Sequence, residues 1–173
     1  MSTELNYVLR PLTQEDEPFL WEMLYQAIYI AEGDPLPERD IVNRTEIAKY
    51  VRGWGRAHDS GFIAIDIGSQ QPIGAAWLRL LTGDDKGYGY VDDATPELSV
   101  AVLPGHRGKG IGTRLLTQLL RAASIHYPAV SLSVAPDNPA SRLYRRLGFE
   151  TVGMSDTSLT MRKTLNASRG EAI

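Results

Sequence analysis

The sequence predicts a single α/β domain, and three features carry that prediction. At 173 residues, the chain has the length of one domain with a full hydrophobic core. Short apolar runs of β type alternate with segments of helical periodicity, without internal repeats or low-complexity linkers. Residues 97–126 join a strand, a basic glycine loop and a helix in direct succession. We therefore expect strands and helices packed around one core.

The first half of the chain is predicted to begin with a strand and a helix. Thr13 suits the N-cap of that helix, and acidic residues follow in its first turn, where the helix dipole favours negative charge. We expect strands over 7–12, 62–67 and 72–81 and helices over about 15–31 and 40–52.

The second half is predicted to contain two more helices. In the later one, Asn138 is a favoured N-cap, Pro139 suits the first helical position, and Gly148 can close the helix in a left-handed conformation. Leu143 and Leu147 are four residues apart and share its buried face. We expect strands over 97–103, 130–134 and 157–164 and helices over about 113–126 and 139–147.

The basic glycine loop before the helix at 113–126 is the most informative part of the chain. The first N–H groups of a helix lack internal acceptors and lie at the positive end of its dipole, so they attract anions. Gly108, Gly110 and Gly112 have no Cβ, which lets a bulky anion approach the backbone. Arg107 and Lys109 add positive charge. The loop therefore indicates a diphosphate ligand.

The spacing of the loop distinguishes between kinds of diphosphate site. A P-loop requires G-x-x-x-x-G-K-[ST], but Gly110 follows Lys109, and the dinucleotide fingerprint G-x-G-x-x-G is absent. The sequence Arg107-x-x-Gly110-x-Gly112 after an apolar strand resembles the acetyl-CoA loop of the GNAT N-acetyltransferase superfamily. The alternative is a strand-to-helix turn whose glycines only allow the chain to bend.

A second segment resembles the same superfamily. Residues Asn138–Phe149, NPASRLYRRLGF, contain an L-Y-x-x-x-G-F pattern that is similar to its second motif. The resemblance covers about 7–164, and its specific motifs lie in the CoA-binding region 97–153. It implies one N-acetyltransferase domain over 1–173, with a mixed, largely antiparallel sheet of about six to seven strands and about four helices. Residues 166–173 are expected to form a tail.

The resemblance also implies which residues bind acetyl-CoA. Val100 and Val102 would contact the pantetheine arm through their main chain, and the amides from Arg107 to Thr113 would hold the pyrophosphate. Asn138 either approaches the pantetheine or only caps its helix. The predicted cofactor-binding residues are Val100, Val102, Arg107, Gly108, Lys109, Gly110, Ile111, Gly112, Thr113 and Asn138.

The implied reaction is attack of a neutral amine on a thioester. A carboxylate is the usual base for an ammonium group, and a phenol can protonate the departing thiolate. The resemblance makes Tyr144 the acid, and Glu97 is the nearest carboxylate on the strand. Glu97 is three residues before Val100, so without a bulge it points to the opposite face. The alternatives are packing for Tyr144 and a solvated strand end for Glu97.

Composition excludes several classes of function. The net charge of −3 gives no basic balance for nucleic-acid binding, and the absence of cysteine excludes disulfides and thiolate metal sites. The three histidines are scattered, so no metal is expected. The chain shows no signal-peptide pattern and no apolar run near the ~18 residues of a membrane span. We expect a soluble, cytoplasmic monomer or homodimer.

Three functional hypotheses follow. The leading one is an enzyme that transfers acetyl from acetyl-CoA to a primary amine of a small molecule or peptide. The second is a non-catalytic acyl-CoA-binding regulatory module. The third is a nucleotide-binding domain for a different diphosphate.

The identity of the acceptor is the feature that the sequence predicts least well. Two acidic clusters and nearby tyrosines would favour a cationic acceptor if they face its pocket, because clefts lined by one sign of charge concentrate the opposite charge. Otherwise they are solvated loops. The residues concerned are Glu32, Asp34, Glu38, Asp40, Asp84, Asp85, Asp92, Asp93, Tyr25, Tyr29, Tyr88 and Tyr90.

Overall fold

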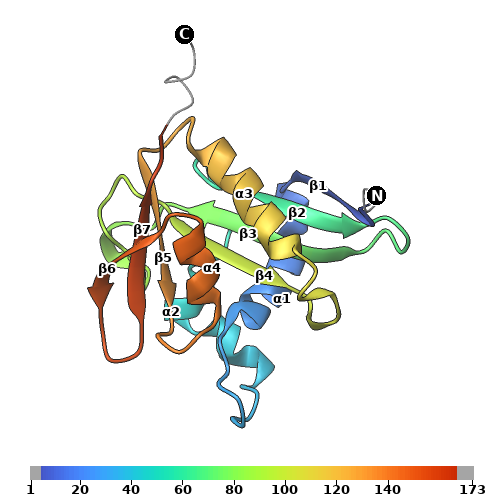
Figure 1. The fold of residues 1–173 in the computed structure, drawn as a ribbon, viewed down its shortest axis with the longest axis horizontal. Helices are drawn as coiled ribbons and strands as arrows, with labels where there is room; N and C mark the ends of the chain where they lie inside the picture. The colour runs from blue at the N-terminus through green and yellow to red at the C-terminus, as the bar shows by residue number, and fades with distance from the viewer. Residues whose placement is uncertain (1–4, 167–173) are drawn as a thin grey trace.

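One sheet runs through the molecule, with helices on both of its faces (Figure 1). The computed structural model describes residues 5–166, so most of the predicted tail lies outside the described residues. The described chain forms seven strands and four α-helices. The strands are β1 (Tyr7–Pro11), β2 (Ser60–Asp66), β3 (Pro72–Arg79), β4 (Glu97–Val102), β5 (Ala129–Val134), β6 (Glu150–Met154) and β7 (Leu159–Thr164). The helices are α1 (Glu17–Ala27), α2 (Thr45–Ala48), α3 (Ile111–Ala123) and α4 (Ala140–Arg146).

The strand order in the sheet is β1-β2-β3-β4-β5-β7-β6. Every neighbouring pair is antiparallel except β4 and β5, which run parallel. This architecture confirms the predicted single α/β domain with a mixed, largely antiparallel sheet. Within residues 5–166, every helix is too short or too polar to cross a bilayer.

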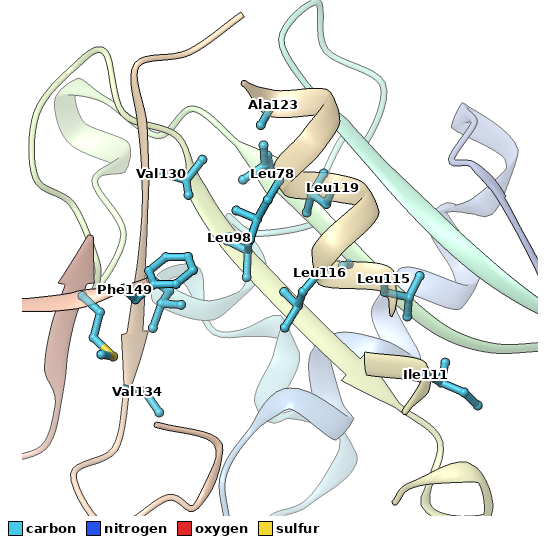
Figure 2. Close-up of a cluster of buried hydrophobic side chains, with 14 of the residues drawn as sticks. Leu78, Leu98, Ile111, Leu115, Leu116, Leu119, Ala123, Val130, Val134 and Phe149 are labelled. Atoms are coloured by element: carbon cyan, nitrogen blue, oxygen red, sulfur yellow. The ribbon is translucent and has the colours of Figure 1, made fainter. Parts of the chain in front are cut away.

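Two hydrophobic clusters hold the helices to the sheet. On one face, α3 packs its leucines against the sheet, and Figure 2 shows Leu116 and Leu119 facing Leu98 and Leu78. On the other face, α1 and the α2 region pack against alternate residues of β3 and β4, including Ala101. The side chains of β4 therefore alternate between the two clusters, which fixes where each of its polar residues points.

The two N-terminal helices are shorter than predicted. A 3-10 turn, Gln14–Asp16, precedes α1, and Ile28 adopts an extended conformation that ends α1 four residues early. The predicted helix over 40–52 contains a 3-10 segment, Arg39–Asn43, followed by the four-residue α2.

A tertiary interaction explains why no regular helix continues after α2. The buried guanidinium of Arg79 donates hydrogen bonds to the carbonyls of Lys49 and Arg52, at 3.0 and 2.6 Å. The indole of Trp77 donates to the carbonyl of Tyr50 at 3.0 Å. These carbonyls satisfy the two buried donors of β3, a requirement that local helix propensity does not contain.

The strands β4 and β5 part soon after they meet. Their ladder has one register pair, Glu97 with Ser131, and the Ser131 amide donates to the Pro96 carbonyl at 3.0 Å. Beyond it, β4 stays paired with β3 and β5 with β7, and Figure 1 shows the two strands running apart. A gap therefore opens in the middle of the sheet, towards the glycine loop.

Candidate active site

An inner cavity lies in the gap between β4 and β5, and a second cavity adjoins it at the glycine loop. The inner cavity, of about 290 Å³, is lined by Glu97, Tyr50 and Tyr88 among others. The loop groove, of about 950 Å³, is lined by the glycine loop and the start of α3. The two share Val100, Asn138, Tyr144, Ala27 and Ile28. A ligand in the loop groove therefore reaches the inner cavity past Val100 and Tyr144.

The glycine loop presents free amides to the loop groove. Gly108 and Gly110 adopt left-handed φ values of +77° and +82°, and a Cβ at either position would enter open space. The first helical bond at α3 runs from the Arg114 amide to the Gly110 carbonyl at 3.1 Å. The amides of residues 111–113 precede it, so they are available to an anion at the positive end of the helix dipole.

The two basic residues of the loop differ in where their side chains lie. The Arg107 guanidinium donates to the Val102 carbonyl at 2.9 Å and to the Gln26 side chain at 3.1 Å. It ties the loop to the end of β4 and to α1 while lining the groove. Lys109 is exposed and does not line the groove. The predicted anion site thus depends mainly on backbone amides.

The backbone of β4 turns alternate polar groups towards the gap. The Leu103 amide donates to the Ile73 carbonyl of β3 at 2.9 Å. In an antiparallel pair, alternate residues direct their backbone groups to opposite edges, so Val100 and Val102 direct theirs away from β3. The amides of both residues and the Val100 carbonyl therefore face the gap, while the Val102 carbonyl accepts the Arg107 guanidinium.

Glu97 lies at the base of the inner cavity, where β4 and β5 are last hydrogen-bonded. The register from Arg79–Glu97 to Gly74–Val102 is unbroken, so β4 contains no bulge and Glu97 points to the face opposite Val100. Both residues nevertheless line the inner cavity, because this cavity passes through the gap in the sheet. Although the two side chains point to opposite faces of the sheet, they can therefore contact the same ligand.

The Glu97 carboxyl is buried and only half satisfied. Its side chain is 5% exposed, and Oε2 accepts a hydrogen bond from the Tyr50 hydroxyl at 2.5 Å. Oε1 has no hydrogen-bond partner among the described residues. Burial raises the pKa of Glu97 to about 7, and the Tyr50 hydrogen bond opposes that rise. A carboxyl with such a pKa can accept a proton near neutral pH.

Tyr50 and the segment 86–90 form the support of Glu97, which sequence reasoning missed. The Tyr88 amide donates to the Tyr50 hydroxyl at 2.8 Å, which orients that hydroxyl towards Glu97. A Cβ at Gly87 would collide with Glu97 Oε1 and the Tyr50 hydroxyl. The Gly89 carbonyl accepts a hydrogen bond from Ser131 at 2.7 Å. In the sequence, the pattern Gly87-Tyr-Gly-Tyr90 is the one local sign that the backbone of this segment approaches Glu97 closely.

Tyr144 faces Glu97's cavity from the other side of the gap. It lies on α4, lines both cavities and packs edge-on against Phe149, with ring centroids 5.9 Å apart. Burial raises its pKa to about 12, so the phenol keeps its proton at neutral pH. Packing and exposure to the cavity therefore occur together at this residue.

Asn138 also serves two purposes. Its Oδ1 accepts a hydrogen bond from the Ala140 amide at 2.9 Å, as a helix cap does, and the residue lines both cavities. Gly148 has a φ of +100° after α4, which confirms the predicted left-handed helix end.

The acidic clusters do not line either cavity. Asp92 instead caps a turn by accepting from the Ala94 amide at 2.9 Å, and Asp93 accepts from the Tyr90 hydroxyl at 2.6 Å. Of the four tyrosines near the clusters, Tyr88 alone lines the inner cavity, while Tyr25 and Tyr29 line the loop groove. Within residues 5–166, no group of three acidic or histidine side chains is arranged to hold a metal ion.

The open sheet, the parted central strands and the glycine loop at a helix start define the acetyltransferase class that the sequence motifs implied. The model of the Acetyltransferase (GNAT) family matches residues 19–149, and the chain belongs to this family. A curated relative, an uncharacterized protein of Mycobacterium leprae (strain TN), is 46% identical over 57 residues. That match covers 32% of this chain and 15% of the relative.

Solved structures share the fold at low sequence identity. PaiA N-acetyltransferase from Thermoplasma acidophilum, in complex with coenzyme A, is 18% identical with a TM-score of 0.64, over 92% of this chain and 99% of that one. A ribosomal-protein-alanine N-acetyltransferase from Brucella melitensis is 24% identical with a TM-score of 0.61, over 91% and 99%.

A chimera of the spermidine N-acetyltransferase SpeG from Vibrio cholerae and hSSAT is 20% identical to this chain. Its TM-score is 0.60, over 93% of this chain and 96% of that one. Two of these neighbours are named for different acceptors, spermidine and a ribosomal-protein alanine, so the shared fold does not select one.

The burial of Glu97 predicts a measurable effect on stability. A folded-state pKa near 7 exceeds the unfolded value of about 4.3, so the folded protein loses stability as pH rises between these values. Glu97→Gln removes this titration. We expect it to be more stable than the parent at pH 8, by about 3 kcal/mol, with the advantage disappearing towards pH 4. Urea unfolding at both pH values measures the difference.

Asp85→Asn is the control, since it removes a carboxylate at an exposed position. A Glu97→Gln variant that is less stable than the parent at pH 8 would show that the charged carboxylate is well accommodated in the fold.

Proposed function

We propose that this enzyme acetylates a primary amine of a small molecule or peptide by direct attack, with Glu97 as the base and Tyr144 as the acid. The observation that carries the proposal is that these two side chains line one cavity, from the two sides of the gap between β4 and β5. Their protonation states suit the roles, because Glu97 titrates near pH 7 and Tyr144 keeps its proton.

The residues of the loop groove fit acetyl-CoA. Open space at Gly108 and Gly110 leaves room for a diphosphate beside the amides of residues 111–113. The amides of Val100 and Val102 and the Val100 carbonyl would meet the amides of a pantetheine arm. Acetyl-CoA, when bound, supplies the acetyl group as a thioester. The arm would lead from the glycine loop towards Tyr144, where the groove adjoins the inner cavity.

Each catalytic side chain has one proton to move. The Glu97 carboxylate accepts the proton of the bound ammonium, through a water where the amine does not reach this buried group, and generates the neutral amine. The Tyr144 hydroxyl donates a proton or a hydrogen bond to the departing sulfur. The Tyr50 hydroxyl donates to Glu97 Oε2 and holds the carboxyl at the base of the cavity.

The placement of the diphosphate predicts the effect of a charge on the loop. Gly110→Asp puts a carboxylate at the start of α3, where the phosphates would lie, and we expect acetyl-CoA binding to weaken at least about tenfold, or about 1.4 kcal/mol. Isothermal calorimetry measures the Kd.

Gly105→Asp is the matched control for that experiment, since Gly105 lies on the same segment but does not line the groove. We expect this control to bind almost normally. Parent-like affinity in a folded Gly110→Asp variant would exclude the diphosphate from this loop.

We expect removal of the Tyr144 hydroxyl to reduce turnover. Tyr144→Phe keeps the ring that packs on Phe149, and we expect kcat to fall by ~10²–10⁴ while the Kd for acetyl-CoA stays near the parent value. Release of CoA thiol over a panel of amines measures the rate.

Tyr127→Phe removes a hydroxyl that does not line either cavity and is expected to retain parent turnover. Unchanged turnover in Tyr144→Phe would leave Tyr144 with a packing role only.

A further inference from the structure

Hydroxyl side chains lie on both sides of the gap, on the face of the sheet that carries Glu97. On β4, Ser99 follows Glu97 by two residues, so the two side chains point to the same face. On β5, Leu132 and Val134 belong to the hydrophobic cluster that contains α3, so Ser133 between them points to the other face. That face is also the face of Glu97. Both serines line the inner cavity, so a ligand there lies between two hydroxyls.

These hydroxyls and two further polar groups of the lining are available to a ligand. Among residues 5–166, neither serine hydroxyl has a hydrogen-bond partner, nor does the hydroxyl of Tyr88, which is 57% exposed. Asn138 uses its Oδ1 to cap α4, and its amide nitrogen has no partner in the same part of the chain. Ser131, by contrast, is fully buried and donates its hydroxyl to the Gly89 carbonyl. The cavity therefore presents several donors and acceptors that a ligand can use.

The apolar residues of the lining contribute less surface than their number suggests. Four of them are between 2% and 5% exposed, because they pack into the two hydrophobic clusters: Leu24, Leu98, Leu132 and Val134. Ile28 and Ile47 are half-buried and form an apolar side near α1 and α2. A ligand that fills the cavity must therefore satisfy polar groups as well as contact apolar ones.

The cavity has no counter-charge for a second charged group on the acceptor. Its lining within residues 5–166 contains no lysine, arginine or histidine, so a carboxylate or phosphate would be buried without a partner. Lys49 lies outside the lining and donates to the Lys86 carbonyl at 2.9 Å. Glu97 is the one carboxyl of the lining, and in the proposed reaction it serves the reacting amine. A second ammonium would therefore also be unpaired.

The volume of the inner cavity limits the acceptor to a compact body. Its volume of about 290 Å³ is at the lower end of the range of about 300–1,000 Å³ for small-molecule sites. A single ring or a short chain fills such a space, whereas a peptide or an oligosaccharide must extend out of it.

We propose that the acceptor is a compact primary amine that carries hydroxyl groups and no second charge, of the amino-alcohol or amino-sugar type, whose hydroxyls bind Ser99 and Ser133. This inference rests on the proposed function and names the substrate class of the same site. It replaces the cationic acceptor predicted from the acidic clusters, because those clusters lie outside the cavity.

Four amines that share one ring test the proposal. Cyclohexylamine has no second substituent, and the other three carry a hydroxyl, a carboxylate or a second amino group at position 4, trans to the amine. The hydroxyl is remote from the reacting nitrogen, so it changes the basicity of the amine little. Thiol release from acetyl-CoA at constant ionic strength gives kcat/KM for each. We expect trans-4-aminocyclohexanol to exceed each of the other three at least about tenfold, because a site that binds a hydroxyl rejects analogues without it.

Removing the two serine hydroxyls shows whether they recognise the acceptor. The measured quantity is the ratio of kcat/KM for trans-4-aminocyclohexanol to that for cyclohexylamine. In the double variant Ser99→Ala/Ser133→Ala this ratio should fall at least about threefold, as expected for the loss of hydrogen bonds to the substrate. A purely structural effect would lower both values and leave the ratio unchanged. Ser124→Ala removes a hydroxyl outside the cavity and should keep the parent ratio.

The outcomes separate this inference from the function on which it rests. Equal or higher kcat/KM for cyclohexylamine, for the carboxylate or for the diamine would overturn the hydroxylated acceptor. So would a parent ratio in a folded Ser99→Ala/Ser133→Ala variant, and the two single variants carry the same expectation if the double variant does not fold. Absence of thiol release with every amine, whether apolar, hydroxylated or peptide, would instead contradict acetyl transfer to amines and this inference with it.

Discussion

The site depends on the way in which β4 and β5 meet at one residue pair and then separate. At Glu97 and Ser131 the sheet is continuous, and beyond this pair the edge of β4 has no strand partner, although Arg107 donates to its Val102 carbonyl. Free backbone groups inside a sheet must find partners, because unpaired buried amides and carbonyls are costly. In the proposed function a pantetheine arm would supply such partners, so the departure from regular pairing would account for both the groove and its ligand.

Separation of the strands also explains how residues from both faces of the sheet share one cavity. Glu97 belongs to the face covered by α1 and α2, and Val100 to the face covered by α3. In a closed sheet the two would never meet a common ligand. The gap removes that barrier, and α4 brings Tyr144 to its other side.

Packing around the site offsets the unfavourable burial of the Glu97 carboxyl. A half-satisfied buried carboxyl is unfavourable for folding, and Glu97 is held in place by the Tyr50 hydroxyl and by the close approach of Gly87. Tyr50 is in turn anchored by Trp77, whose indole binds its carbonyl. The unfavourable features of the fold, such as this buried carboxyl, are concentrated at the candidate site. The two hydrophobic clusters supply the stability.

Features with a local cause could be predicted from the sequence, and features with a tertiary cause could not. The glycine loop, the start of α3 and the left-handed Gly148 depend on local backbone conformation and on helix ends. Residue types at those positions are therefore enough to predict them. The helix expected over 40–52 failed because Arg79 and Trp77, far along the chain, take its carbonyls.

The candidate base shows the same division. Strand alternation placed Glu97 on the correct face of β4, but the gap that exposes it to the cavity depends on β5. Tyr50 lay within an apolar helical pattern and gave no local sign of a polar role. The acidic clusters were visible in the sequence, yet their position outside the cavity depends on loop paths that composition does not encode.

The pH dependence of kcat/KM in the parent and in Tyr50→Phe, with one amine, tests most directly whether the carboxyl at the base of the gap is the catalytic base. The parent should lose activity as pH falls below about 7, because Glu97 becomes protonated. Tyr50→Phe removes a hydrogen bond that lowers the pKa of Glu97, so this loss should begin at a higher pH. The ionisation of the amine itself is common to both enzymes and cancels in the comparison. A loss of activity that begins only near pH 4, or that begins at the same pH in both enzymes, would contradict the account.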